Sequence, residues 1–186
     1  MLYKCLKNNI INENGFEIKP VSIDDIELIR VWRNHQMDVL RQKREISKLE
    51  QVKYFEENIA VLYNEEKPSQ LIFSYFKDDI LVGYGGLVNL SWDDRRAEMS
   101  FLLNPLFVKN NILYKQYFSQ FITFMKQINF DQLAFHKLFT ETYEHRNYHI
   151  SILVESGFVL EGILKDHVCL KNKFFNSLIH SIIYNV

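Results

Sequence analysis

Residues 100–118, SFLLNPLFVKNNILYKQYF, place a cation and two amide side chains where a predicted strand passes into a predicted helix. Free backbone N–H groups at a helix N-terminus bind phosphate, and glycines commonly let the backbone close around the anion. This segment contains no glycine. Lys109 supplies a positive charge, and Asn110 and Asn111 are of the non-glycine type that best tolerates left-handed backbone. The pattern predicts a phosphate-binding turn, with an ordinary helix-start loop as the alternative.

The composition limits the classes of partner and cofactor. The chain has 186 residues, 47% of them hydrophobic, which suits one compact domain with a sizeable core. Its formal net charge is −1, so no basic field points to nucleic acid. Cys5 and Cys169 lie far apart, and with the scattered histidines they show no metal-ligand spacing. No apolar run is long enough for a membrane, and the polar first residues do not resemble a signal peptide, so we expect a cytoplasmic protein without a metal.

Alternating strand and helix patterns predict one α/β (α+β) domain over residues 1–186, with residues 1–15 as an N-terminal extension or hairpin. The predicted order is β–α–α–β–β–β–α–β–α–β–β, which gives a mixed central sheet of about seven strands with helices on both faces. The helices are expected at 22–34, 47–64, 113–130 and 149–158, and the strands at 1–21 (a hairpin), 70–76, 80–90, 95–103, 137–143, 161–170 and 174–184.

Local signals indicate where several of these elements begin and end. Ser22 is the predicted N-cap of the first helix, with Asp25 near its first N–H groups, and Ser47 with Glu50 forms the S-x-x-E pattern of a capping box. Gly157 is a natural C′ residue for the last helix. The final strand, SLIHSIIY, is interpreted as a sheet edge that can pair with a second copy in a homodimer. The apolar face of the helix at 113–130 consists of Tyr114, Phe118, Phe121 and Met125.

Three stretches carry a family resemblance: ILVGYGGLVNLSWDDRRAEMSFLLNP, KLFTETYEHRNYHISILVESGFVLEG and IRVWRNHQMDVLRQKREISKLEQVKYFEENI. The first resembles the central hairpin and cofactor-holding strand of the acetyl-CoA-dependent N-acetyltransferases of the GNAT superfamily. The second resembles the strand, helix and "GF…EG" close of the RimJ/RimL-like branch. The third is similar to acetyltransferases that act on amino-sugar nucleotides in surface-glycan pathways, of the type that makes pseudaminic acid. The resemblance covers about residues 16–186.

The resemblance implies direct attack of an amine on the thioester carbonyl of acetyl-CoA. Because an alkylammonium is mostly protonated near neutral pH, the amine needs a base, and Glu98 on the cofactor-holding strand is the candidate. The alternative for Glu98 is a surface carboxylate paired with Arg95 or Arg96. The family stabilises the oxyanion with a backbone N–H of this strand, which places Leu102 or Leu103 against the thioester.

Two positions depart from the family pattern. Many relatives have a tyrosine that protonates the leaving thiolate, but here that place falls on Leu153, which cannot donate a proton. Thiolate is a tolerable leaving group, because thiol pKa values lie near ~8.5, so an acid is not obligatory. Arg146 stands where an asparagine usually caps the helix; it is expected to bind a phosphate, with an exposed surface arginine as the alternative. The nearby candidates for the acid are Tyr143, which we favour, and Tyr148, His149 and Tyr114.

The resemblance also implies which residues bind the two substrates. Contacts to acetyl-CoA are expected from Lys109, Asn110, Asn111, Ile112, Arg146 and His149. Contacts to the acceptor are expected from Trp32, Arg33, Asn34, Arg41 and Gln42. The alternatives are a core position for Trp32, a helix cap for Asn34, and a solvated loop for Arg41 and Gln42.

Three functions follow from these residues. The first is acetylation of a small-molecule amine, the amino group of a nucleotide-linked amino sugar, without nucleic acid or membrane as a partner. The second is acetylation of a protein N-terminus or an amino acid. The third is a non-catalytic binding module that kept the fold, motivated by the missing glycines and by Leu153.

Overall fold

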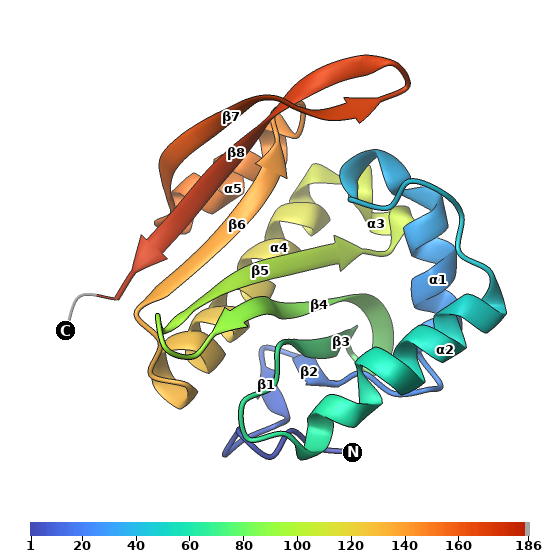
Figure 1. The fold of residues 1–186 in the computed structure, drawn as a ribbon, viewed down its shortest axis with the longest axis vertical. Helices are drawn as coiled ribbons and strands as arrows, with labels where there is room; N and C mark the ends of the chain where they lie inside the picture. Colours follow the sequence, from blue (N-terminus) through green and yellow to red (C-terminus); the bar gives the residue numbers. More distant parts are fainter. Residues whose placement is uncertain (185–186) are drawn as a thin grey trace.

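The computed structural model describes residues 1–184, which form one α+β domain around a single mixed sheet (Figure 1). The sheet has eight strands in the order β1-β2-β3-β4-β5-β6-β8-β7, and only β5 and β6 are parallel neighbours. The predicted fold class is confirmed, but the strand count is eight rather than about seven, because the N-terminal hairpin contributes two strands instead of one.

The elements have the following bounds. The strands are β1 (Ile11–Glu13), β2 (Phe16–Pro20), β3 (Leu71–Lys77), β4 (Ile80–Ser91), β5 (Arg96–Leu103), β6 (Lys137–Tyr143), β7 (Val159–Leu170) and β8 (Lys173–Ile183). The helices are α1 (Ile26–His35), α2 (Lys48–Asn58), α3 (Pro105–Val108), α4 (Asn111–Lys126) and α5 (Asn147–Glu155), with the short helical turns η1 (Met37–Val39), η2 (Ala60–Asn64) and η3 (Gln127–Gln132). No helix among residues 1–184 is both long enough and apolar enough to cross a membrane.

Helices cover both faces of the sheet, and the core lies beneath α4. In Figure 1, α1 and α2 lie in front of the sheet, whereas α4 and α5 lie behind it. The predicted apolar face of α4 is buried as expected, and Phe118 stacks on Phe101 of β5 with ring centroids 4.8 Å apart. Burying an aromatic side chain of this size contributes roughly 1.5–3 kcal/mol, so this helix holds β5 in place.

The sheet opens between β5 and β6. The two strands pair only where Arg96–Glu98 lies beside Lys137–Phe139, and beyond Glu98 they diverge (Figure 1). On its other side β5 stays paired with β4 as far as Leu103, with a register shift between Val88 and Ser91. A gap therefore forms in the middle of the sheet, bordered by the unpaired edges of β5 and β6.

Two of the local signals behave as predicted, and one does not. Ser47 and Glu50 form the complete capping box of α2. Gly157 has φ +89°, and the N–H of Phe158 donates to the carbonyl of Leu153, which closes α5 with a Schellman motif. The first helix begins at Ile26 and not next to Ser22, because the Asp25 carboxylate accepts from both Ser22 and Ser74 of β3.

The outer strand at the C-terminal end of the sheet is β7, not β8. β8, which contains most of SLIHSIIY, lies between β6 and β7 and is paired on both sides. The predicted edge position of this strand is therefore wrong. β7 itself has two register shifts against β8, a feature that disfavours pairing with another chain. A homodimer remains a prediction, and neither β7 nor β8 offers a regular edge for pairing with a second copy.

Candidate active site

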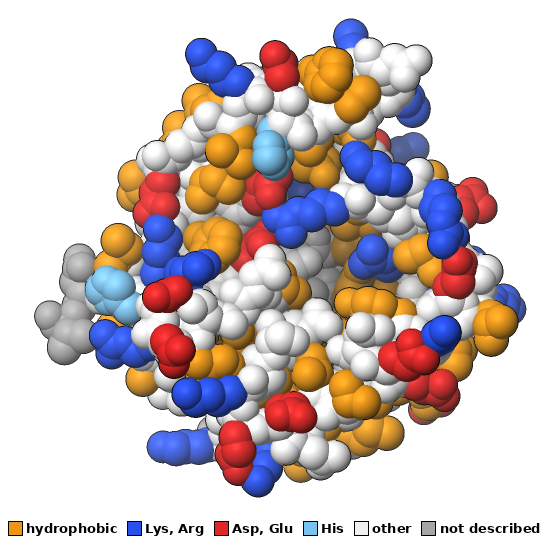
Figure 2. All heavy atoms as spheres, in the orientation of Figure 1, with side chains coloured by type: hydrophobic (Ala, Val, Ile, Leu, Met, Phe, Trp, Pro, Cys, Tyr) orange, Lys and Arg blue, Asp and Glu red, His pale blue; other side chains and the backbone are white. Residues whose placement is uncertain are grey.

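A cavity of about 350 Å³ occupies the gap between β5 and β6, and we call it the gap cavity. Figure 2 shows a hollow near the centre of this face of the molecule, with basic and acidic side chains around it. Ionisable and polar groups from several strands, helices and loops meet there. The lining includes Arg33, Arg41, Glu98, Ser100, Phe118, Glu141, Tyr143, Arg146 and His149.

Glu98 is a buried carboxylate on β5. Strand alternation places it with Ser100 and Leu102 on the face that carries α1 and α2. Its residue is 6% exposed, and it accepts hydrogen bonds from Asn89 Nδ2 at 2.7 Å and Arg41 Nη2 at 2.7 Å. The alternative pairing with Arg95 or Arg96 does not occur, since Arg96 reaches Asp94 instead.

Arg41 lies between two carboxylates of the gap cavity. Its Nη2 donates to Glu98 and, at 2.5 Å, to Glu141 of β6. Burial alone raises the pKa of the Glu141 carboxyl, but hydrogen bonds and the charge of Arg41 outweigh it, so the net pKa lies below the ordinary value. Sequence reasoning missed Glu141. The alternation Phe139, Glu141, Tyr143 on a strand parallel to β5 is the signal that places it on the same face as Glu98.

Tyr143 presents a buried hydroxyl without a hydrogen-bond partner among residues 1–184. The residue lines the gap cavity, and burial together with the charge of Glu141 raises its pKa. A neutral phenol of this kind is a proton donor. Leu153 lies fully in the core, so α5 offers no acid at that position.

Tyr114 of α4, His149 of α5 and Arg146, the N-cap residue of α5, form a hydrogen-bonded cluster, and the last two line the gap cavity. Tyr114 Oη lies 2.8 Å from His149 Nδ1, and Arg146 Nη2 lies 3.1 Å from the same hydroxyl. Burial, and then the charge of Arg146, lower the pKa of His149 well below its ordinary value, so its ring is neutral. The His149 ring stacks on Phe118 at 4.1 Å, which fixes it in the wall of the cavity.

The N-terminus of α4 is closed by its own cap. Asn110 has an extended backbone (φ −94°, ψ 101°), and its side-chain oxygen accepts from the N–H groups of Ile112 and Leu113. The expected left-handed turn at Asn110 and Asn111 is therefore wrong, because the amide caps the helix instead of reshaping the loop. Ile112 is 80% exposed, and Lys109 is exposed beside it. A phosphate at this helix end has to displace the Asn110 oxygen or share its donors.

The backbone of β5 presents donors to the gap. Asn104 donates its N–H to Val82 of β4, and alternation then turns the amide of Leu102 toward β4 as well. The N–H and C=O groups of Phe101 and Leu103 consequently face away from β4, toward the gap. In agreement, the Leu103 carbonyl accepts from Gln36 Nε2 at 2.9 Å rather than from β4. Of the two predicted oxyanion donors, the structure leaves Leu103 available and adds Phe101.

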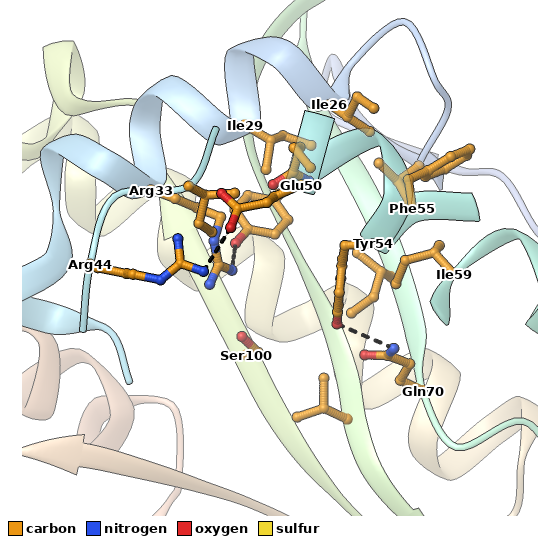
Figure 3. Close-up of a pocket in the computed structure, with 16 residues that line it drawn as sticks. Ile26, Ile29, Arg33, Arg44, Glu50, Tyr54, Phe55, Ile59, Gln70 and Ser100 are labelled. Carbon is orange, nitrogen blue, oxygen red and sulfur yellow. Dashed lines mark hydrogen bonds and ion pairs between the residues drawn. The ribbon is translucent and has the colours of Figure 1, made fainter. Parts of the chain in front are cut away.

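A second cavity, of about 380 Å³, lies under α1 and α2, and we call it the helix-side cavity (Figure 3). Apolar side chains such as Ile26, Ile29 and Phe55 form most of its wall, and Tyr54 and Gln70 lie at one end. The cavity has Arg33, Tyr54, Val88 and Ser100 in common with the gap cavity. The two cavities therefore adjoin next to Glu98.

Arginines give the helix-side cavity its charge. Arg33 binds two neutral groups, the Tyr84 hydroxyl at 2.6 Å and Gln42 Oε1 at 3.1 Å, and forms no ion pair within the described part of the chain. Arg44 is paired with Glu50, 2.6 Å away, on the same side of the cavity (Figure 3). The cavity thus carries a net positive charge.

The five predicted acceptor residues fall into two groups, those that line the cavities and those that do not. Arg33 and Arg41 line the cavities, whereas Trp32 is 5% exposed and lies in the core. Asn34 holds the loop before α2, since it binds both the N–H and the C=O of Ile46. Gln42 links Arg33 to Asn34. Arg33 and Arg41 are therefore the members of this set that remain acceptor candidates, and the other three support them.

The fold and this gap define a family of enzymes. The sequence profile of the acetyltransferase (GNAT) domain matches residues 18–179, so the chain belongs to the GNAT acetyltransferases. It is accordingly an N-acetyltransferase that uses acetyl-CoA. No curated protein matches the chain in sequence.

Solved structures show the same fold at low sequence identity. Spermidine N-acetyltransferase SpeG from Vibrio cholerae, in complex with CoA and spermine, superposes with a TM-score of 0.78 at 16% identity, covering 92% of this chain and 96% of that one. A dodecameric structure of the same enzyme in an intermediate state gives 0.73 at 16% identity, over 92% and 95% of the two chains. A chimera of SpeG and hSSAT gives 0.79 at 16% identity, over 91% and 96%.

The residues present fit acetyl-CoA. The gap leaves the backbone groups of Phe101 and Leu103 for the pantetheine arm and thioester, and the gap cavity has room beside them. Arg146 and the exposed Lys109 supply positive charge on the α4–α5 side. When bound, acetyl-CoA supplies an activated acetyl group as a thioester.

Proposed function

We propose that the protein transfers the acetyl group to the amine of a nucleotide-linked amino sugar. The observation that carries this proposal is the environment of Arg33. This half-buried cation lies at the junction of the two cavities, and its hydrogen bonds go to neutral partners. An arginine without an acidic partner is a ready binding site for a phosphate, which it can contact with two parallel hydrogen bonds. The apolar wall of the helix-side cavity offers a surface for a sugar or a base.

The side chains of the gap cavity supply the remaining chemistry. Glu98 accepts the proton that the acceptor amine must lose before it attacks. The amides of Phe101 and Leu103 face the gap as donors for the negative charge that develops on the carbonyl oxygen. Tyr143 supplies a hydroxyl proton on the opposite edge of the gap, for the leaving sulfur. Each group lies on a strand, which holds it more rigidly than a loop.

Charge argues against a polyamine, the ligand named for the SpeG complex. The helix-side cavity has Arg33 and Arg44 on its wall, and its one lining carboxylate, Glu50, is already paired. Two like charges about 6 Å apart repel by about 3 kcal/mol at an effective dielectric constant of 20. A polycation is therefore repelled from this cavity, whereas a diphosphate is attracted to it.

A panel of acceptors tests the proposal. Purified protein with acetyl-CoA is assayed for thiol release, and products are checked by mass spectrometry. The panel comprises UDP- and dTDP-linked 4-amino sugars, spermidine, spermine, and a peptide with a free N-terminus. We expect turnover of a nucleotide-linked amino sugar and little turnover of the polyamines. No turnover of any nucleotide sugar, or preferential acetylation of spermine, contradicts the proposal. A calorimetric titration that shows no CoA binding points to a binding module.

A further inference from the structure

We propose that Arg41 selects the acceptor, because its guanidinium occupies the place of the acceptor ammonium and leaves it only for an anionic group on the same molecule. This inference rests on the proposed function and deepens it: the preferred acceptors are amines that carry a phosphate or another anion within reach of the loop before α2. Glu98 then serves as a base only after the anion has drawn Arg41 away.

Arg41 and two carboxylates meet at one point of the gap cavity. One nitrogen, Arg41 Nη2, lies 2.7 Å from Glu98 and 2.5 Å from Glu141. An alkylammonium is a compact cation with three donors, and it can bind between the same two carboxylates. Only one cation fits between the two carboxylates, so the guanidinium of Arg41 and the acceptor ammonium compete for this position.

The two carboxylates are buried, but Arg41 is not. The side chains of Glu98 and Glu141 are only 8% and 12% exposed, whereas that of Arg41 is 57% exposed. Two buried carboxylates without a cation are strongly destabilising, so in the free enzyme Arg41 neutralises them, while His167 Nε2 lies further off, 3.9 Å from Glu141. Arg41 can leave because solvent already reaches most of its side chain.

The loop around Arg41 is anchored on both sides. Asn34 holds Ile46 through two hydrogen bonds, and Gln42 donates to Asn34 at 2.8 Å. On the other side, η1 follows α1 directly, and its last turn is closed by the N–H of Leu40. Release of Arg41 is therefore a rotation of one side chain and not an opening of the loop.

The place to which Arg41 can move lies near Arg33. Arg41 lines the gap cavity together with Arg33, which also lines the helix-side cavity. A phosphate held by Arg33 thus lies next to the loop that carries Arg41. When the acceptor ammonium takes the place of Arg41 between the carboxylates, Arg41 can pair with this phosphate instead. The number of ion pairs therefore stays the same.

The test compares two acceptors in wild-type protein and in Arg41→Gln. The acceptors are the nucleotide-linked amino sugar and its methyl glycoside, which has the same amine but no phosphate. In Arg41→Gln we expect kcat/KM for the nucleotide sugar to fall about tenfold or more through KM, and kcat/KM for the methyl glycoside to rise about threefold or more. Lys43→Gln, an exposed change in the same loop that lines neither cavity, should alter neither value.

A second measurement can be decided on the wild-type protein, because Arg41→Gln removes a cation from two buried carboxylates and can weaken the fold. Inorganic pyrophosphate is added to the methyl glycoside reaction as a separate anion. We expect it to accelerate wild type and to leave Arg41→Gln unchanged. An equal loss of both acceptors in Arg41→Gln, or no acceleration of wild type by pyrophosphate, overturns the inference.

These outcomes separate the two proposals. If nucleotide sugars are turned over but Arg41→Gln lowers both acceptors equally, the role of Arg41 fails and the proposed function stands. A different result is that nucleotide sugars are not acetylated, while the methyl glycoside is acetylated faster in wild type with pyrophosphate and faster in Arg41→Gln without it. In that case the proposed acceptor fails and the role of Arg41 stands.

Discussion

Replacing Glu98 with Gln removes the base while keeping the shape of the side chain. Removal of a positioned general base slows an enzyme by about 10²–10⁴-fold, equivalent to about 3–5 kcal/mol of activation free energy. We therefore expect kcat to fall by about this factor. KM should change less, because the glutamine still accepts from Asn89, which lies 2.7 Å from the carboxylate.

The same change has a small effect on stability. Arg41 keeps Glu141 as a partner, so the loss is one charge-assisted hydrogen bond, about 1–2 kcal/mol. For a chain of this size 1 kcal/mol lowers Tm by about 2–4 °C, so the variant stays folded at assay temperature.

The assay is initial-rate thiol release at saturating acetyl-CoA, with Tm and CoA affinity measured on the same preparations. Glu141→Gln is the matched control, since it removes the other carboxylate of the Arg41 pair but not the base, and it should act mainly on KM. A Glu98→Gln enzyme whose kcat stays within tenfold of wild type, with Tm and CoA affinity unchanged, refutes the assignment of Glu98.

Three further predictions concern single groups of the site. Tyr143→Phe removes a buried hydroxyl that has no partner within residues 1–184, so Tm should not fall, while kcat should drop about tenfold if this hydroxyl protonates the sulfur. Asn110→Gly frees the amides of Ile112 and Leu113, so calorimetry should show tighter CoA binding; weaker binding would mean that Asn110 itself contacts the ligand. Because folding lowers the pKa of the Glu141 carboxyl, its contribution to stability is complete above the ordinary value of 4.5 and lost as pH falls through the folded-state pKa; acid unfolding of Glu141→Gln should therefore be less steep than that of wild type.

The features that sequence predicts well are those decided by neighbouring residues. The capping box at Ser47 and Glu50 forms because both partners lie within one turn. Gly157 ends α5 because the left-handed conformation there favours glycine. The apolar face of α4 is buried because its spacing matches the helical period.

The features that sequence does not predict depend on distant contacts. Ser22 does not cap α1, because its hydroxyl donates to Asp25, whose carboxylate also accepts from Ser74 Oγ, 2.6 Å away on β3. Glu141 becomes part of the site only through the parallel register of β5 and β6. The position of β8 inside the sheet follows from a crossover that places it between β6 and β7, and no local pattern in its sequence marks that.

The two halves of the reaction are controlled by different parts of the molecule. In the proposed mechanism acetyl-CoA meets mainly backbone, at the unpaired edge of β5, whose geometry the fold determines. The likeness to SpeG at 16% identity is a likeness of this fold. The proposed acceptor meets side chains from α1, α2 and the loop between them, where Arg33, Arg41 and Arg44 line the two cavities. Because charge there is set residue by residue and not by the fold, the acceptor of a structural neighbour does not transfer with its backbone. Arg33 of α1 and the arginines of the following loop, rather than the overall superposition, are the features from which the acceptor should be inferred.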